Sequence, residues 1–252
     1  MPSLRIIPRL DVKGENVVKG IHLEGLRVIG KPGDLAQRYY ADGADELIFM
    51  DIVASLYGRN NILSVVEAAA KNIFVPMTVG GGIRSLEDVK AVLRSGADKV
   101  AINTAAIARP QFLREAAEAF GSQCVVLSVE AKRRGVGQWE ALTDNGRERT
   151  GREVLQWVEE AASLGIGEVL LTSVDQEGTK KGLDLDLIAA VTRRVPVPVV
   201  ACGGVGGVAD IENGINRGVL SGVACASIFH YGILPLSALK QGLRSLGREV
   251  RL

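Results

Sequence analysis

Short apolar runs rich in valine, isoleucine and leucine alternate along the chain with longer amphipathic segments. Such runs, each followed by a helical pattern, are typical of parallel strands that are buried on both faces. We expect eight strands, at residues 5–11, 46–52, 75–79, 99–103, 124–130, 168–174, 197–202 and 223–226. The helical periodicity predicts helices at residues 33–42, 62–71, 85–95, 110–120, 151–164, 185–194, 208–217 and 235–246.

An internal repeat divides the chain into two halves. Residues 43–51 resemble residues 165–173 at an offset of 122 positions, and residues 79–83 align with residues 201–205 at the same offset. Two four-strand halves that close on each other predict an α/β fold, a (β/α)8 TIM barrel with two-fold half-barrel pseudo-symmetry, formed by residues 1–252 as a single domain. An open doubly wound sheet is the alternative, but it predicts no repeat of half the chain.

Composition and charge narrow the class of protein. The chain carries 30 Lys and Arg against 29 Asp and Glu, so its net charge of +1 provides no basic field for nucleic acid or a membrane surface. No stretch approaches the ~18 apolar residues of a membrane span, and the N-terminus lacks the apolar core of a signal peptide. The three cysteines each lie in an apolar run, which indicates reduced, buried thiols. We therefore expect a cytoplasmic protein.

Carboxylates stand at the ends of four expected strands. Asp11 ends the first and Glu130 the fifth, at equivalent points of the repeat that are 119 positions apart, while Asp51 and Asp175 end the second and sixth. The active site of such barrels lies at the C-terminal ends of the strands, so Asp11 and Glu130 should face each other across the barrel mouth. For a single aspartate at such a position, a structural role in capping the loop is as good an explanation as a catalytic role. The repeated pair instead favours general acid and general base catalysis.

Two glycine turns occupy equivalent places after the third and seventh strands. Glycine lets backbone N–H groups approach an anion closely, and the helix start that follows each turn favours negative charge. The next strand of each half ends in a small hydroxyl residue. The expected phosphate sites are Gly81, Gly82, Asn103 and Thr104 in the first half, and Gly203, Gly204, Ala226 and Ser227 in the second. The implied ligand carries a phosphate at each end and spans the barrel mouth.

Two further groups of charged residues allow more than one interpretation. Lys13 and Lys19 follow the first strand, either in a solvated basic loop or in a mobile lid that reaches an anionic substrate. Four charged residues at strand starts favour, taken alone, a structural salt-bridge plug at the barrel floor; they are Arg5, Glu46, Lys99 and Glu168. His22 and His230 lack metal-ligand spacing, so we expect no metal and no cofactor.

Seven segments in this order resemble the cyclase subunits of imidazole glycerol phosphate synthase, a barrel family of histidine biosynthesis. They are RIIPRLDVK at 5–13, VVKG at 17–20, VGGGIR at 79–84, AINT at 101–104, LTSVDQEGT at 171–179, CGGV at 202–205 and ASIFH at 226–230. The resemblance covers nearly the whole chain. It implies a lyase that takes ammonia from a partner glutaminase at the barrel floor and passes it through the barrel to a formimino-linked phosphoribulosyl carboxamide ribonucleotide. The implied products are imidazole glycerol phosphate and aminoimidazole carboxamide ribotide.

The resemblance also implies roles for individual residues. Asp11 matches the catalytic general acid/base, Glu130 stands at the position of the second catalytic carboxylate, and Lys19 matches the lid lysine. The matches to the two phosphate sites are Gly82 with Thr104 and Gly204 with Ser227. The charged quartet at the floor matches the ammonia gate, which changes its interpretation from structural to functional. The related phosphoribosyl isomerase shares the phosphate sites and paired acids but needs neither gate nor glutaminase.

Two positions depart from the family pattern. Glu130 replaces an aspartate, and its extra methylene moves the carboxylate by about 1 Å, which can cost ~10²-fold in a positioned acid/base step. Arg9 replaces a small residue, and strand alternation turns its side chain into the barrel on the face of Asp11. We expect this guanidinium to pair with Glu130 or Asp51, and pairing with Glu130 would lower the pKa of that acid. It could also narrow an ammonia path.

These departures leave three functions open. The first is a working cyclase with its glutaminase partner in histidine biosynthesis. The second is a paralogue that keeps the barrel, gate and partner but delivers ammonia to another acceptor, for example in amidine formation on a surface sugar. The third is a non-catalytic, phosphate-binding scaffold that regulates a glutaminase.

Overall fold

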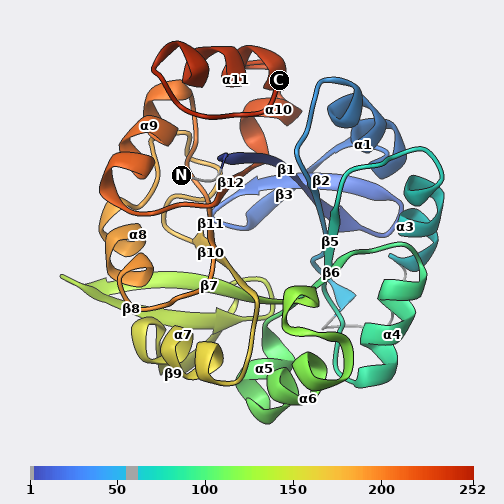
Figure 1. Cartoon of the computed structure of the whole chain (residues 1–252), viewed down its shortest axis with the longest axis vertical. Coiled ribbons are helices and arrows are strands. Elements are labelled where there is room, and N and C mark those ends of the chain that lie inside the picture. The colour runs from blue at the N-terminus through green and yellow to red at the C-terminus, as the bar shows by residue number, and fades with distance from the viewer. Residues whose placement is uncertain (1–2, 55–61) are drawn as a thin grey trace.

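The computed structural model describes residues 3–54 and 62–252, and a closed barrel of parallel strands lies at its centre (Figure 1). In spatial order the eight strands are β1 (Arg5–Lys13), β4 (Leu47–Asp51), β5 (Met77–Gly80), β6 (Lys99–Ile102), β7 (Val125–Gly135), β10 (Glu168–Ser173), β11 (Val199–Cys202) and β12 (Gly222–Cys225). Strand β12 pairs with β1, and β7 pairs with β10, which closes the ring. The predicted (β/α)8 barrel is confirmed.

A ring of helices surrounds the strands (Figure 1). These helices are α1 (Pro32–Ala41), α3 (Leu63–Ala70), α4 (Leu86–Arg94), α5 (Thr104–Ala108), α6 (Gln111–Phe120), α7 (Val154–Ser163), α8 (Leu185–Thr192), α9 (Val208–Arg217), α10 (Ser227–His230) and α11 (Leu236–Ser245). A short 3-10 helix, η1 (Ser122–Cys124), precedes β7. Each helix turns an apolar stripe inward, such as Phe112, Leu113 and Ala116 of α6, onto the outward-facing side chains of the strands.

The opposite faces of the strands fill the barrel interior. Successive side chains of a strand point to opposite faces, so every second residue enters the barrel. Ile7, Ile48, Val126, Leu170 and Val200 belong to an apolar cluster that is separate from the layer between strands and helices. The charged residues of β1 lie before and after Ile7 on the same face, so a polar layer stands at each end of this interior cluster.

Two antiparallel hairpins extend the C-terminal end of the barrel, and the sequence pattern did not predict them. Their strands are β2 (Asn16–Ile21) and β3 (Glu24–Gly30), which follow β1, and β8 (Gln138–Thr143) and β9 (Glu148–Glu153), which follow β7. The first hairpin stands where we expected a loop, so that expectation was wrong. The second delays the helix expected from residue 151 until Val154. Because β1 and β7 are equivalent in the repeat, the hairpins reinforce the two-fold pseudo-symmetry.

The helix starts behind the two glycine turns are capped in a similar way. In the first half, the Asp88 carboxylate accepts hydrogen bonds from the backbone N–H groups of Arg84 and Ser85, at 2.9 and 3.0 Å. In the second half, the Asp210 carboxylate accepts from the N–H groups of Gly206 and Gly207, at 2.8 and 3.0 Å. Such caps satisfy the free N–H groups at the chain's entry to a helix and therefore fix the turns that precede it.

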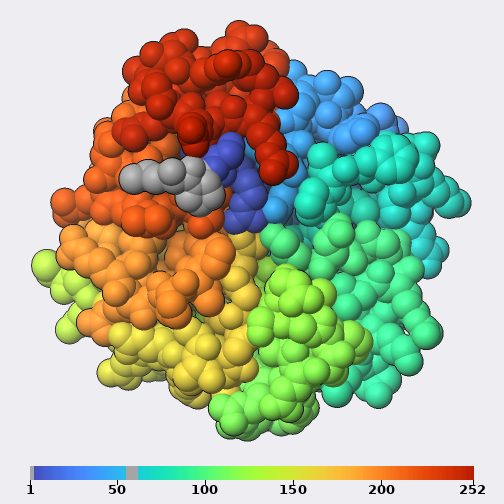
Figure 2. Space-filling model, in the orientation of Figure 1, coloured from blue at the N-terminus to red at the C-terminus, as the bar shows by residue number. Residues whose placement is uncertain are grey.

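The two ends of the described chain meet on one face of the barrel. The N–H of Leu4 donates to the carbonyl of Glu249 at 2.9 Å, and Figure 2 shows the first described residues beside the C-terminal segment. In the described residues, no helix is both long and apolar enough to cross a membrane.

A buried ion pair joins the last helix to the barrel floor. The Lys240 ammonium, on a side chain that is 2% exposed, donates to Asp45 Oδ1 at 2.8 Å and to the Gly43 carbonyl at 2.6 Å. Asp45 Oδ2 also accepts the N–H of Ile6 in β1 at 2.7 Å. We expect Lys240→Met to lower the free energy of unfolding by about 3–5 kcal/mol, because it leaves the buried Asp45 carboxylate without its counter-ion.

Urea denaturation of wild type and Lys240→Met measures this loss. The double variant Lys240→Met/Asp45→Asn is the matched control, and it should lose less stability than Lys240→Met alone because neither charge is then left unpaired. A loss below about 1 kcal/mol in the single variant would show that this ion pair contributes little to the fold.

Candidate active site

The two carboxylates that the repeat pairs lie opposite each other at the barrel mouth. Asp11 is near the C-terminal end of β1 and Glu130 is on β7, four strands away in a ring of eight. Both side chains are buried, at 4% and 6% exposed. The fold therefore brings the two acids to the same end of the barrel from opposite walls.

Two cations hold the Asp11 carboxylate. Arg9 Nε donates to Asp11 Oδ1 at 2.8 Å, and Lys19 Nζ lies 3.7 Å from Asp11 Oδ2. Lys19 comes from β2 and is also paired with Glu177. Burial raises the pKa of Asp11, but the charges of Arg9 and Lys19 outweigh it and lower this pKa below its ordinary value. Asp11 is thus held as a carboxylate.

The partner of Arg9 differs from the sequence expectation. The guanidinium pairs with Asp11 on its own strand and face, and not with Glu130 or Asp51. Its Nη1 also donates to Thr172 Oγ1 at 3.0 Å and approaches Cys202 Sγ at 3.6 Å. The expected pairing was wrong because residues two apart on a strand share a face, within reach of a long side chain.

Among the described residues, the hydrogen-bond partners of Glu130 are uncharged. Its Oε2 accepts from Asn103 Nδ2 at 3.1 Å and from the N–H of Gly146 at 2.7 Å. Burial raises the pKa of Glu130 to about 7, against the opposing effects of Arg9 and the Gly146 N–H. We expected this pKa to fall if Arg9 paired with Glu130; the pairing is absent and the pKa rises. Glu130 is therefore poised to exchange a proton near neutral pH.

The first expected phosphate site lines a cavity that contains Glu130. The cavity has a volume of about 260 Å³, and its lining includes Asp51, Gly81, Gly82, Asn103, Thr104, Ser128, Glu130 and Asn145. Gly81 has φ +96°, and a Cβ on it would lie 2.1 Å from the Asp51 carbonyl oxygen, so the turn requires glycine. Burial raises the pKa of Asp51, and its Oδ1 accepts the N–H of Val53 at 3.1 Å.

The second expected phosphate site is nearly filled. Gly203, Gly204, Ala226 and Ser227 line a cavity of only about 10 Å³, together with Glu177 and Lys180. Gly204 has φ +98°, and a Cβ on it would lie 2.0 Å from the Gly182 carbonyl oxygen. The glycine turn and hydroxyl are thus together as expected, but a cavity of this size is too small for a phosphate, so the site must widen to bind one.

Asp175 is an expected site residue that, like Asp11 and Lys19, lines neither cavity. Its Oδ1 pairs with Lys132 Nζ at 2.7 Å, and its Oδ2 accepts the N–H of Arg133 at 2.8 Å. Burial raises the pKa of Asp175, but the Arg133 N–H and Lys132 outweigh it and lower this pKa. The carboxylate joins the loop after β10 to β7, beside the site.

Sequence reasoning assigned no role to two residues that the structure places at the mouth. Glu177 pairs with Lys19 and lines the second cavity. Asn145, in the β8–β9 turn, lines the first cavity, and both polar atoms of its side chain are buried without a partner among the described residues. Burying such groups unpaired costs about 1–3 kcal/mol each, which a polar ligand or water would remove. The sequence signals for both residues were weak. Glu177 lies in segment 171–179, which resembles the family, and Asn145 lies in a hairpin that the sequence pattern did not predict.

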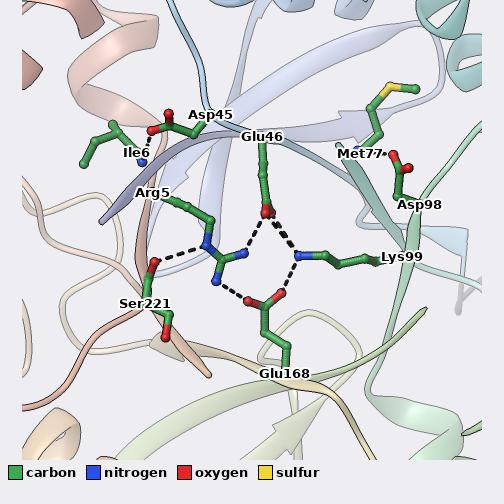
Figure 3. A network of polar contacts seen from close by, with 9 residues as sticks. All are labelled: Arg5, Ile6, Asp45, Glu46, Met77, Asp98, Lys99, Glu168 and Ser221. Carbon is green, nitrogen blue, oxygen red and sulfur yellow. Dashed lines mark hydrogen bonds and ion pairs between the residues drawn. The ribbon is translucent and has the colours of Figure 1, made fainter. Parts of the chain in front are cut away.

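The four charged residues at the strand starts form a closed ring on the barrel floor (Figure 3). Arg5 pairs with Glu46 at 2.6 Å and with Glu168, and Lys99 lies 3.2 Å from Glu46 and 2.9 Å from Glu168. Arg5 Nε also donates to the Ser221 carbonyl at 3.1 Å. The ring borders an open hollow of about 430 Å³ whose lining includes Arg5, Lys99 and Glu168. Alternating charges thus separate this hollow from the barrel interior.

Comparison with known proteins places the chain in a family. Residues 5–235 match the family described as "Histidine biosynthesis protein", and the chain belongs to that family. It is 59% identical over 206 residues to "Imidazole glycerol phosphate synthase subunit HisF" of Legionella pneumophila, across 82% of this chain and 97% of that protein. It is 48% identical to the proteins of the same name from Streptococcus sanguinis strain SK36 and Streptococcus gordonii strain Challis, each over the full length of both chains.

Proposed function

We propose that this protein is the cyclase subunit of imidazole glycerol phosphate synthase and acts as an ammonia-dependent lyase in histidine biosynthesis. Its relatives of that name support this assignment. The observation that carries it is a charged ring on the floor of the same barrel whose mouth holds Asp11 opposite Glu130. An isomerase with paired acids has no use for such a ring, whereas an enzyme that admits ammonia from below requires a controlled entry.

The substrate we propose is the bis-phosphate, formimino-linked phosphoribulosyl carboxamide ribonucleotide. The first cavity offers one phosphate end the N–H groups near Gly81 and Gly82 and the hydroxyl of Thr104. The other end would enter the second site, at Gly204 and Ser227, once that site widens. This arrangement would suspend the reacting centre between Asp11 and Glu130, and cleavage after ammonia addition would give the two products.

The partner we propose is a glutaminase that docks on the barrel floor and covers the hollow beside the charged ring. Ammonia released there would pass Arg5, Glu46, Lys99 and Glu168, cross the interior and reach the acids without meeting solvent. We propose a cytoplasmic heterodimer without metal or cofactor.

Opening the ring should uncouple the two ends of the barrel. Lys99→Met leaves Glu46 and Glu168 with Arg5 as their only cation in the ring, so the ring reorganises. We expect glutamine-dependent turnover with the glutaminase subunit to fall roughly tenfold, within the usual range of coupling between distant sites. Turnover with saturating free ammonia should change by less than about twofold, because the mouth is unaltered.

The matched control is Arg194→Met, which removes an exposed ion pair with Glu159 on the helix layer. Its glutamine-dependent turnover should equal that of wild type, because exposed pairs contribute little. Equal loss of both activities in Lys99→Met would make the ring a purely structural plug and contradict its role as an ammonia entry.

A further inference from the structure

Arg9 breaks the two-fold symmetry of the barrel interior. The repeat offset of 119 makes Ser128 its equivalent in the second half, and Ser128 lines the open 260 Å³ cavity beside Glu130. Arg9 instead extends across the interior from β1 to Thr172 on β10 and Cys202 on β11, and it is 2% exposed. The barrel mouth is therefore open on the Glu130 side and filled beneath the second phosphate site.

The two acids consequently have different electrostatic surroundings. Charges alternate from Arg9 through Asp11 and Lys19 to Glu177, and all four side chains are at most 5% exposed. Glu130 has an amide and a backbone N–H as its hydrogen-bond donors. Other titratable groups that interact with Asp11 are His230 from α10, Cys202 from β11 and Glu130 from β7. Burial lowers the pKa of His230 to about 4, so its ring is neutral at pH 7.

We propose that Arg9 is a positioning residue that holds the Asp11 carboxylate as the base of the reaction and leaves proton donation to Glu130. This inference rests on the proposed function for the identity of the reaction. Asp11 accepts the proton that the ammonia nitrogen loses as its lone pair forms the bond to the acceptor carbonyl carbon. Glu130 gives its proton to the carbonyl oxygen, which receives the electron pair of the C=O bond. One proton is taken and one is given, so no further reactant is needed.

Contacts from two different nitrogens of the Arg9 guanidinium explain why this residue would fix the assignment. Its Nε orients one oxygen of Asp11, while Thr172 and Cys202 hold Nη1, so the carboxylate cannot rotate without breaking a fixed set of contacts. The pKa directions agree with the geometry, since the pKa of Asp11 is lowered while that of Glu130 is raised to about 7. Groups whose surroundings separate their pKa values in this way take opposite roles in proton transfer.

The first test is the pH profile of kcat/KM with free ammonia, at a fixed concentration of the NH3 form. Wild type should show a falling limb near pH 7, where free Glu130 loses its proton, and a rising limb from Asp11 at lower pH. Arg9→Met, which keeps a similar shape without the charge, should move the rising limb upward by about one pH unit or more. In Arg9→Lys, which keeps a positive charge, the rising limb should lie close to its wild-type position. If Arg9→Met lowers kcat/KM without moving either limb of the pH profile, Arg9 only fills space in the barrel, and the proposal is overturned.

The second test needs no turnover and keeps the proposal separate from the proposed function. The carboxyl carbon of Asp11 is followed by NMR in protein with 13C-labelled aspartate, and Asp11→Asn identifies its signal. In wild type this signal should titrate below the ordinary range of an aspartate, and in Arg9→Met it should titrate at least one pH unit higher. Equal midpoints in the two proteins would overturn the proposal even if the protein is an active cyclase. A shifted midpoint without turnover would uphold the positioning of Asp11 and overturn both its role as the reaction's base and the proposed function.

Discussion

Replacing Asp11 by asparagine is expected to lower ammonia-dependent turnover by about 10²–10⁴-fold, the usual contribution of a positioned acid or base. Asparagine keeps the shape of the side chain but cannot accept a proton. It also leaves Arg9 and Lys19 without the carboxylate that lies 2.8 and 3.7 Å from their nitrogens. The variant should therefore lose stability as well. Thermal unfolding of both proteins gives the fraction that is folded at the assay temperature, and turnover is compared per folded molecule.

Asp175→Asn is the matched control for this prediction. Its carboxylate also follows a barrel strand, but it pairs with Lys132 and accepts the N–H of Arg133, so its contacts join two loops and do not include Arg9 or Lys19. We expect its turnover to stay within about tenfold of wild type, because it acts on the loop and not on the reacting atoms. Comparable losses in the two variants would indicate that any lost carboxylate disturbs the mouth, and the catalytic role of Asp11 would then be unsupported.

Replacing Glu130 by glutamine is expected to lower ammonia-dependent turnover to a similar extent as Asp11→Asn. It should also stabilise the protein at alkaline pH. The pKa of Glu130 is about 7 in the folded chain and 4.5 as the ordinary value, so the folded state holds this proton more tightly. The stability of wild type therefore falls as the pH rises from about 4.5 to about 7. At pH 8 the ionised side chain costs on the order of 3 kcal/mol, which glutamine avoids while still accepting from Asn103 and Gly146.

Urea denaturation of wild type and Glu130→Gln from pH 4.5 to pH 8 measures this difference. The variant should be more stable at pH 8, and its advantage should shrink towards zero as the pH approaches 4.5. Glu130→Asp, which keeps an ionisable group, serves as the control and should retain a pH-dependent stability. A constant difference between wild type and Glu130→Gln across this range would mean that Glu130 is ionised throughout and is not the proton donor.

The sequence predicted the barrel because its strands are buried on both faces and repeat in two halves. It also placed the floor ring, since residues at the starts of parallel strands occupy one layer, as Arg5 and Lys99 do. It missed the hairpins because their pairing depends on contacts along β1 and β7, which local periodicity does not record.

The electrostatics of the mouth were less predictable from the sequence. Strand alternation correctly placed Arg9 on the face of Asp11. We nevertheless expected Arg9 to pair with Glu130 or Asp51, whereas it pairs with Asp11 on its own strand. The near-filled second phosphate site depends on Glu177, which arrives from the loop after β10 and meets Lys19 from β2. Such contacts between segments that are distant in sequence form only when the barrel closes, so no single segment predicts them.

The most direct measurement is turnover of the purified chain alone with free ammonia and the formimino-linked phosphoribulosyl carboxamide ribonucleotide, with both products quantified by chromatography. We predict equimolar imidazole glycerol phosphate and aminoimidazole carboxamide ribotide, formed without any glutaminase. If the bis-phosphate binds but neither product forms, the chain is not this cyclase. Its ammonia would then go to another acceptor, or the barrel would act as a scaffold without chemistry.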